Sequence, residues 1–127
     1  MKRRSYLALV VVGLLVAATS PLFAHHSWPV NFSKAITVVG TVTSYSWGNP
    51  HVMMVLDVKG SNGAMEKWEV GGPSTTRMER NGWSRSTLKF GDVITATGFQ
   101  FADGQKVLRL EKVVMADGKE MLLYGTR

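Results

Sequence analysis

The chain has 127 residues, no cysteine and a formal net charge of +6, from 15 basic and nine acidic side chains. Three of the basic residues lie in the first four positions, so the chain from residue 25 onward carries only +3, from twelve basic and nine acidic side chains. The lack of cysteine excludes disulfides and thiolate metal sites. So mild a positive charge gives no reason to expect a nucleic-acid partner.

Residues 1–24 have the three parts of an export signal. A basic start at positions 2–4 precedes an apolar run over residues 6–18, and Ala24 closes a short polar-to-small segment. The apolar run is shorter than the roughly 20 residues that a membrane span needs. We therefore expect cleavage after Ala24, a mature start at His25, a periplasmic or secreted protein, and no stable membrane span after cleavage. Cleavage at a neighbouring bond and retention as an amino-terminal anchor are the alternatives.

After a predicted N-terminal arm over residues 25–35, the sequence predicts a single domain over residues 36–127. Alternating apolar and polar residues predict strands. Gly40, inside the first of them, marks a bend or bulge, and Tyr45 falls on the face opposite Val42. In chain order, the predicted strands cover residues 36–45, 51–58, 65–70, 93–99, 107–115 and 121–124.

One helix interrupts the strands, over about residues 74–81. Thr76 and Glu79 have the spacing of a capping box, and Asn81-Gly82 is typical of a helix end. We expect Trp83 to pack beneath this helix. Three strands, a helix and two or three more strands form the order of an OB-fold. The sequence thus predicts an all-β protein with one short helix, built as a small antiparallel OB-fold-like β-barrel; other small barrels and sandwiches are the alternatives.

The three histidines, His25, His26 and His51, are the candidate metal ligands. A terminal amine and the imidazole of the same residue form a bidentate nitrogen chelate, and nitrogen ligands favour copper(II) above other divalent ions. His51, after Asn49-Pro50, could add a third nitrogen. A second arrangement uses the amine, the intervening amide and His26. The competing interpretation makes the histidine pair a polar chain start and His51 a hydrogen-bonding loop residue.

Methionines and tryptophans provide weaker signals. Six methionines follow residue 24, and they are typical of core packing, although Met53 shares a strand face with His51. We expect Trp68 in the core. Trp47, beside Asn49, is the candidate ligand-facing ring, with packing as its alternative role. No catalytic residues are predicted, because no nucleophile elbow, zinc-protease helix or phosphate loop is present.

Four motifs resemble an uncharacterised family of short exported bacterial proteins, catalogued as a domain of unknown function. They are Ala24-His25-His26-Ser27, Trp47-Gly48-Asn49-Pro50-His51, Arg80-Asn81-Gly82-Trp83 and Leu88-Lys89-Phe90-Gly91-Asp92. The resemblance covers the chain after residue 24 and implies a periplasmic location and one small β-barrel. Trp28-Pro29 stands where the pattern has Phe and a small residue. No activity follows from the resemblance.

The sequence therefore predicts an exported protein that binds a small ligand, with copper as the leading cofactor. Its ligands would be His25 and His51, with His26 as an auxiliary ligand. The alternative is an envelope binding or assembly module without a metal, which would hold an oligosaccharide, a peptide or another envelope protein. An oxygen-activating copper enzyme is not favoured, because no substrate cleft is suggested by the sequence.

Overall fold

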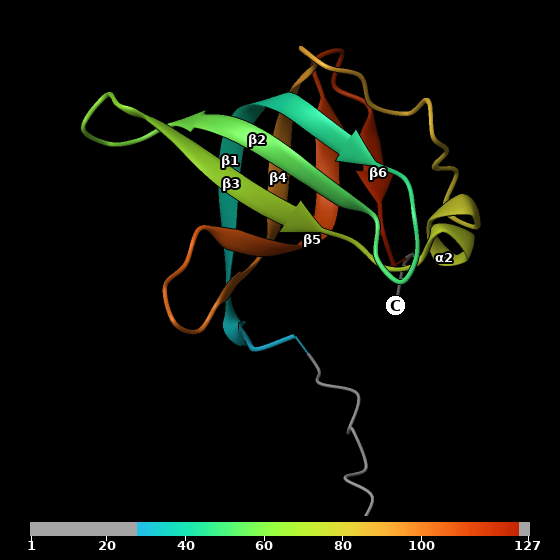
Figure 1. The fold of residues 1–127 in the computed structure, drawn as a ribbon, viewed down its shortest axis with the longest axis horizontal. Coiled ribbons are helices and arrows are strands. Elements are labelled where there is room, and N and C mark those ends of the chain that lie inside the picture. The colour runs from blue at the N-terminus through green and yellow to red at the C-terminus, as the bar shows by residue number, and fades with distance from the viewer. Residues whose placement is uncertain (1–27, 125–127) are drawn as a thin grey trace, which may run out of the picture.

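A computed structural model describes residues 28–124, and this part of the chain folds into six strands and one short helix (Figure 1). The sheet order is β3-β2-β1-β4-β5-β6, and an added pairing of β3 with β5 closes the first five strands into a ring. Among the strand pairs in the described part of the chain, only β3–β5 is parallel. The predicted all-β architecture with one short helix is confirmed. The elements are β1 (Val30–Ser46), β2 (Met53–Lys59), β3 (Met65–Gly71), α2 (Thr75–Glu79), β4 (Val93–Phe101), β5 (Val107–Met115) and β6 (Glu120–Leu122).

Strand β1 is shared by both halves of the ring. It starts at Val30, six residues before the predicted start, so part of the predicted arm is strand. Its first part pairs with β4 and its last part with β2, and Gly40 pairs with both strands at once. A Cβ atom on Gly40 would lie 2.9 Å from the Asp57 carbonyl oxygen. Glycine is therefore required where the bent strand meets its two neighbours (Figure 1).

Against β2, the β-bulge of β1 lies at Thr43, not at Gly40, and against β4 a second register shift lies between Val30 and Ala35. Val42 pairs with Leu56 and Ser44 with Val55, so Thr43 is the extra residue. Residues with even numbers face the core before the bulge, and residues with odd numbers face it afterwards. The prediction that Tyr45 lies on the face opposite Val42 is consequently wrong, because both side chains pack against the same core.

The core lies inside the ring and follows the predicted alternation in β2 and β3. The inward-facing residues Met54, Leu56 and Val58 of β2 are buried, as are Trp68 and Val70 of β3, whereas Glu66 on the same face of β3 is half-buried. The predicted burial of Trp68 is confirmed. Strand β2 pairs with β3 in an unbroken antiparallel register from Met53–Gly71 to Lys59–Met65. The buried side chains with essentially no exposure include Val42, Val52, Leu56, Val70, Ala96, Leu108, Leu110, Val113 and Leu123.

Helix α2 begins after Ser74, so the predicted capping box at Thr76 is wrong. Ser74 is the N-cap and makes no side-chain capping bond. The Asn49 side chain, from the β1–β2 loop, accepts a hydrogen bond from the Thr75 N–H instead (3.0 Å). The helix ends at Glu79, with Arg80 as its C-cap, two residues before the predicted end at residue 81. Gly82 does adopt the positive φ, 83°, that is typical of a glycine after a helix. Within residues 28–124, no helix has the length and apolar character needed to cross a membrane.

Candidate functional site

His51 lies on the outer face of the loop between β1 and β2, next to the end of β3. Its Nδ1 is 3.1 Å from the Gly72 carbonyl oxygen. A carbonyl oxygen only accepts hydrogen bonds, so Nδ1 carries the hydrogen and donates it. In the neutral ring this leaves the lone pair on Nε2. Because the His51 side chain is exposed, Nε2 is available to a ligand, with the ring held by the backbone as metal-binding histidines usually are.

Trp28 packs directly on His51. The two ring centroids are 4.9 Å apart with an interplanar angle of 89°. Phe101, at the end of β4, contacts the indole in a second edge-on arrangement at 5.7 Å. The backbone next to Trp28 is also fixed, since the Ala102 N–H donates to the Pro29 carbonyl oxygen at 2.8 Å. The first described residue of the chain is thus docked beside the one histidine that residues 28–124 contain.

The Trp28 ring packs against the backbone of Gly71. A Cβ atom at this position would lie 2.0 Å from Cη2 of Trp28 and 3.1 Å from Sδ of Met53. Two side chains from different segments therefore meet over the bare Cα of Gly71. Met53 pairs directly with Gly71 across the β2–β3 hairpin. Trp28, His51 and Met53 lie close together on the outside of the closed ring of strands, next to Gly71. We call these three residues the Trp28 cluster.

Asn49 and Trp47, the predicted ligand-facing residues, lie in the same loop as His51. The amide oxygen of Asn49 accepts hydrogen bonds from the Thr75 backbone N–H at 3.0 Å and the Thr75 hydroxyl at 3.2 Å. Asn49 therefore ties the loop to helix α2. Trp47 is half-buried, packs against the core and lies 6.0 Å from the Tyr45 ring. Burial also raises the pKa of the Tyr45 phenol.

His25 and His26, the other predicted ligands, lie outside the described residues. Among residues 28–124, no three histidine, aspartate or glutamate side chains converge as a metal site would require. The described part of the chain thus contributes His51 to the predicted set, together with the sulfur of Met53 nearby. The thioether of methionine is a soft metal ligand.

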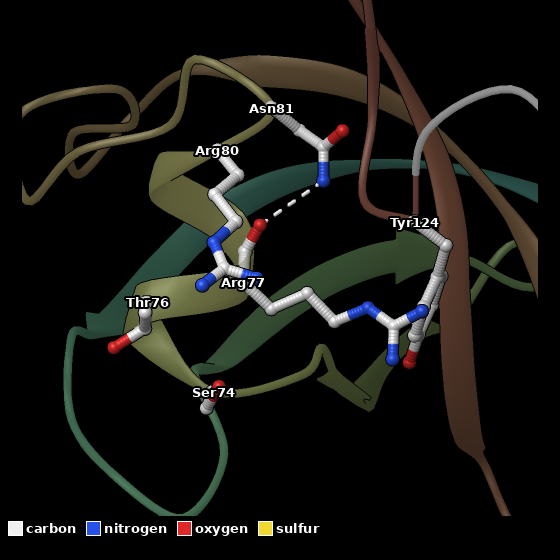
Figure 2. Close-up of a pocket in the computed structure, with 6 residues that line it drawn as sticks. All are labelled: Ser74, Thr76, Arg77, Arg80, Asn81 and Tyr124. Atoms are coloured by element: carbon white, nitrogen blue, oxygen red, sulfur yellow. Dashed lines mark hydrogen bonds between the residues drawn. The ribbon is translucent and has the colours of Figure 1, made fainter.

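A separate pocket of about 390 Å³ lies between α2 and the end of the described chain. Figure 2 shows the Arg77 side chain reaching from the helix toward the Tyr124 ring. The guanidinium carbon of Arg77 is 5.0 Å from the ring centroid, and that of Arg109 is 4.2 Å from it. The pocket is lined by Ser74, Thr76, Arg77, Arg80, Asn81 and Tyr124.

This pocket has an excess of positive charge. Arg109 forms an ion pair with Glu111, whereas Arg77 and Arg80 form no ion pair with any residue in the range 28–124. Burial raises the pKa of the Tyr124 phenol, and the positive charge of Arg109 opposes that increase. The pocket can donate several hydrogen bonds to an anion through its guanidinium groups.

Sequence reasoning missed the roles of Trp28, Gly71 and the arginine pocket. In the sequence, Trp28 stands out only as a departure from a family motif, and Gly71 carries no signal of a functional role. The position of Trp28 close behind His-His-Ser was a usable signal. Nothing in the sequence placed that indole on Gly71, because the contact joins residues 43 positions apart in the chain.

Comparison with known families matches residues 11–108 to DUF6152, which is described as a family of unknown function. No curated protein matches the chain.

Proposed function

The chain belongs to the DUF6152 family, whose function is unknown, and we propose that this protein is exported and binds copper at a site built on His51. The observation that carries the proposal is the hydrogen bond of His51 Nδ1 to the Gly72 carbonyl oxygen. It leaves Nε2 as an exposed imidazole nitrogen in a fixed ring, and imidazole nitrogen is a preferred ligand of copper. The remaining ligands come from the mature N-terminus.

Chain length supports a shared site for His51 and the N-terminus. His25 precedes Trp28 by three residues, so the two Cα atoms are at most about 11 Å apart in an extended chain. Trp28 itself touches His51, with 4.9 Å between ring centroids. The amine and ring of His25 can therefore reach a metal bound to His51 Nε2. His26 would serve as an auxiliary ligand through the alternative chelate.

The proposed scaffold is an OB-fold-like β-barrel. Its support is the closed ring β1-β2-β3-β5-β4, in which β1 pairs with two strands and α2 lies between β3 and β4 in the chain. Five strands in a closed Greek-key arrangement are typical of that fold. The site would then lie on the outer wall of the barrel, on the β1–β2 loop and the end of β3.

The test begins with the intact mass of the protein purified from the exporting compartment, followed by copper(II) titration monitored by electron paramagnetic resonance. We expect a mass that starts at His25 and one equivalent of copper(II) with nitrogen hyperfine structure. His51→Ala and His25→Ala should each lower the affinity about tenfold or more, since each removes a direct ligand.

The matched control is Phe90→Ala, because Phe90 is an exposed loop residue with 81% of its surface accessible. This variant should bind copper(II) like the parent protein. A mature start at another residue, together with weak binding that His51→Ala leaves unchanged, would refute the copper proposal.

A second candidate function is an envelope module that binds a ligand bearing a phosphate or carboxylate group. It is favoured by the pocket at α2, which Arg77, Arg80 and Tyr124 line and in which the Arg77 side chain reaches toward the Tyr124 ring (Figure 2). Calorimetric titration with inorganic phosphate and with acetate tests it. Arg77→Gln should abolish the heat of binding, while Arg85→Gln, an exposed arginine outside the pocket lining, should not. No measurable binding in the parent protein would reject this function.

A further inference from the structure

The Trp28 cluster combines three groups suited to a soft monovalent metal. His51 offers Nε2, and Met53 offers its thioether sulfur from the same outer face of the hairpin. The alternation confirms this shared face, since Val52 and Met54, on either side of Met53, are both buried. The indole of Trp28 lies over Gly71 next to both side chains, touching the His51 ring and approaching the Met53 sulfur.

The chemistry of these groups differs from that of the nitrogen chelate. Thioethers are poor ligands for copper(II) but select copper(I). An aromatic face attracts a cation that lies within about 6 Å of the ring centroid. A partly buried indole also excludes water, which strengthens the attraction. An amine nitrogen is a harder donor than a thioether, so the predicted N-terminal amine favours copper(II) over copper(I).

We propose that His51 and Met53 bind copper(I) beside the Trp28 ring, without the terminal amine. The inference deepens the proposed copper function, and it rests on that function for the identity of the metal. It assigns Met53 as a second ligand and makes Trp28 part of the metal site. Copper(II) and copper(I) would then share His51 but use different partners, namely the N-terminal nitrogens for copper(II) and the Met53 sulfur for copper(I).

Ordinary packing is the competing explanation of the Met53–Trp28 contact, because methionine sulfur packs favourably against aromatic rings. Met53→Leu separates the two explanations. Leucine has nearly the same volume and is well tolerated in place of methionine, but it has no sulfur. Met65→Leu is the matched control, since Met65 lies at the opposite end of the hairpin, where it pairs with Lys59.

The experiment is an anaerobic competition titration of the mature protein with copper(I) and a chromophoric copper(I) chelator. We expect one equivalent of copper(I), quenching of tryptophan fluorescence, and a copper–sulfur path in X-ray absorption. Met53→Leu and His51→Ala should each weaken copper(I) binding about tenfold or more. Met53→Leu should also remove the copper–sulfur path, and His51→Ala should also remove the fluorescence quenching. Met65→Leu should bind like the parent protein.

A one-residue extension before His25 distinguishes this inference from the proposed function. The extension removes the terminal chelate and should abolish high-affinity copper(II) binding, yet leave copper(I) affinity unchanged. Copper(I) binding that resists Met53→Leu would overturn the inference while leaving the copper(II) site intact. Copper(I) binding that the extension abolishes would also overturn it, and would support the N-terminal chelate instead. Copper(I) binding without any copper(II) site would support the inference and refute the chelate.

Discussion

At the scale of single residues, the site depends on the absence of a side chain at Gly71. Gly71 has no side chain, and the Trp28 ring occupies the space where one would be. The ring contacts both His51 and Phe101. One glycine thus joins the start of the described chain to the hairpin that carries His51 and Met53.

We predict that Gly71→Ala expels the indole from its seat. The added Cβ would meet Cη2 of Trp28 at 2.0 Å, and such overpacking costs about 1–3 kcal/mol of unfolding free energy. Urea denaturation measures this loss, and copper(I) affinity should fall with it. Gly48→Ala is the control, because a Cβ at Gly48 would have no neighbour within 4 Å. Equal stability of the two variants would contradict the packing seen at Gly71.

At the scale of elements, the β1–β2 loop is held to helix α2 by Asn49. Its side-chain oxygen accepts two hydrogen bonds from Thr75. Asn49 thus caps the first turn of the helix, since the side chain of the N-cap residue Ser74 makes no capping hydrogen bond. The loop that positions His51 is therefore braced by the helix. The same bond stabilises the first turn of a helix that contains only five residues.

Asn49→Ala should destabilise the protein by about 1 kcal/mol, the usual cost of losing a helix cap. The Thr75 amide should also exchange faster with deuterium, since its acceptor is removed. Asn49→Asp keeps an acceptor oxygen and should preserve both the stability and the slow exchange. The Thr75 amide would exchange at the same rate in all three proteins if the cap had no energetic role.

Local patterns predicted much of the fold but not the contacts of the site. Alternation predicted the faces of β2 and β3 correctly, because one face of each strand packs on the core and the other lies on the outside of the ring. It failed at Tyr45, where the bulge at Thr43 shifts the pattern by one residue. The capping box failed for a related reason, since the cap of α2 comes from a residue 26 positions earlier. The Asn-Pro-His motif predicts His51 as a ligand from the sequence alone, whereas the position of the Trp28 ring on Gly71 is visible only in the folded chain.

At the scale of the whole molecule, closure of the ring rests on a short parallel pairing. Strands β3 and β5 share three residue pairs, from Glu69–Val107 to Gly71–Arg109. Gly71 therefore takes part in the closure as well as in the site. Beside this pairing, the Lys106 ammonium forms an ion pair with the Glu66 carboxylate at 2.6 Å.

The hydrogen bond from Lys106 holds the pKa of Glu66 below its usual value. A carboxyl group with a lower pKa in the folded state adds stability above its unfolded pKa, and that stability is lost as the pH falls through the folded value. Lys106→Gln should therefore raise the pKa of Glu66, as measured by carbon-detected NMR titration. Lys67→Gln, which removes the partner of Asp57, should leave the Glu66 titration unchanged. An identical Glu66 titration in the parent and Lys106→Gln proteins would contradict the ion pair.

The bulge at Thr43 also has an evolutionary consequence. Inward-facing positions change from even to odd residue numbers at this residue. The parts of β1 before and after the bulge therefore differ in which residue numbers face the core. Deletion of Thr43 would remove the extra residue and leave a regular ladder, because Val42 and Ser44 already pair with the adjacent residues Leu56 and Val55, so Tyr45 and Trp47 would still face the core. Relatives that lack this one residue should accordingly keep the same pairing of β1 with β2, whereas loss of one residue from a regular strand would reverse the faces of the residues beyond it.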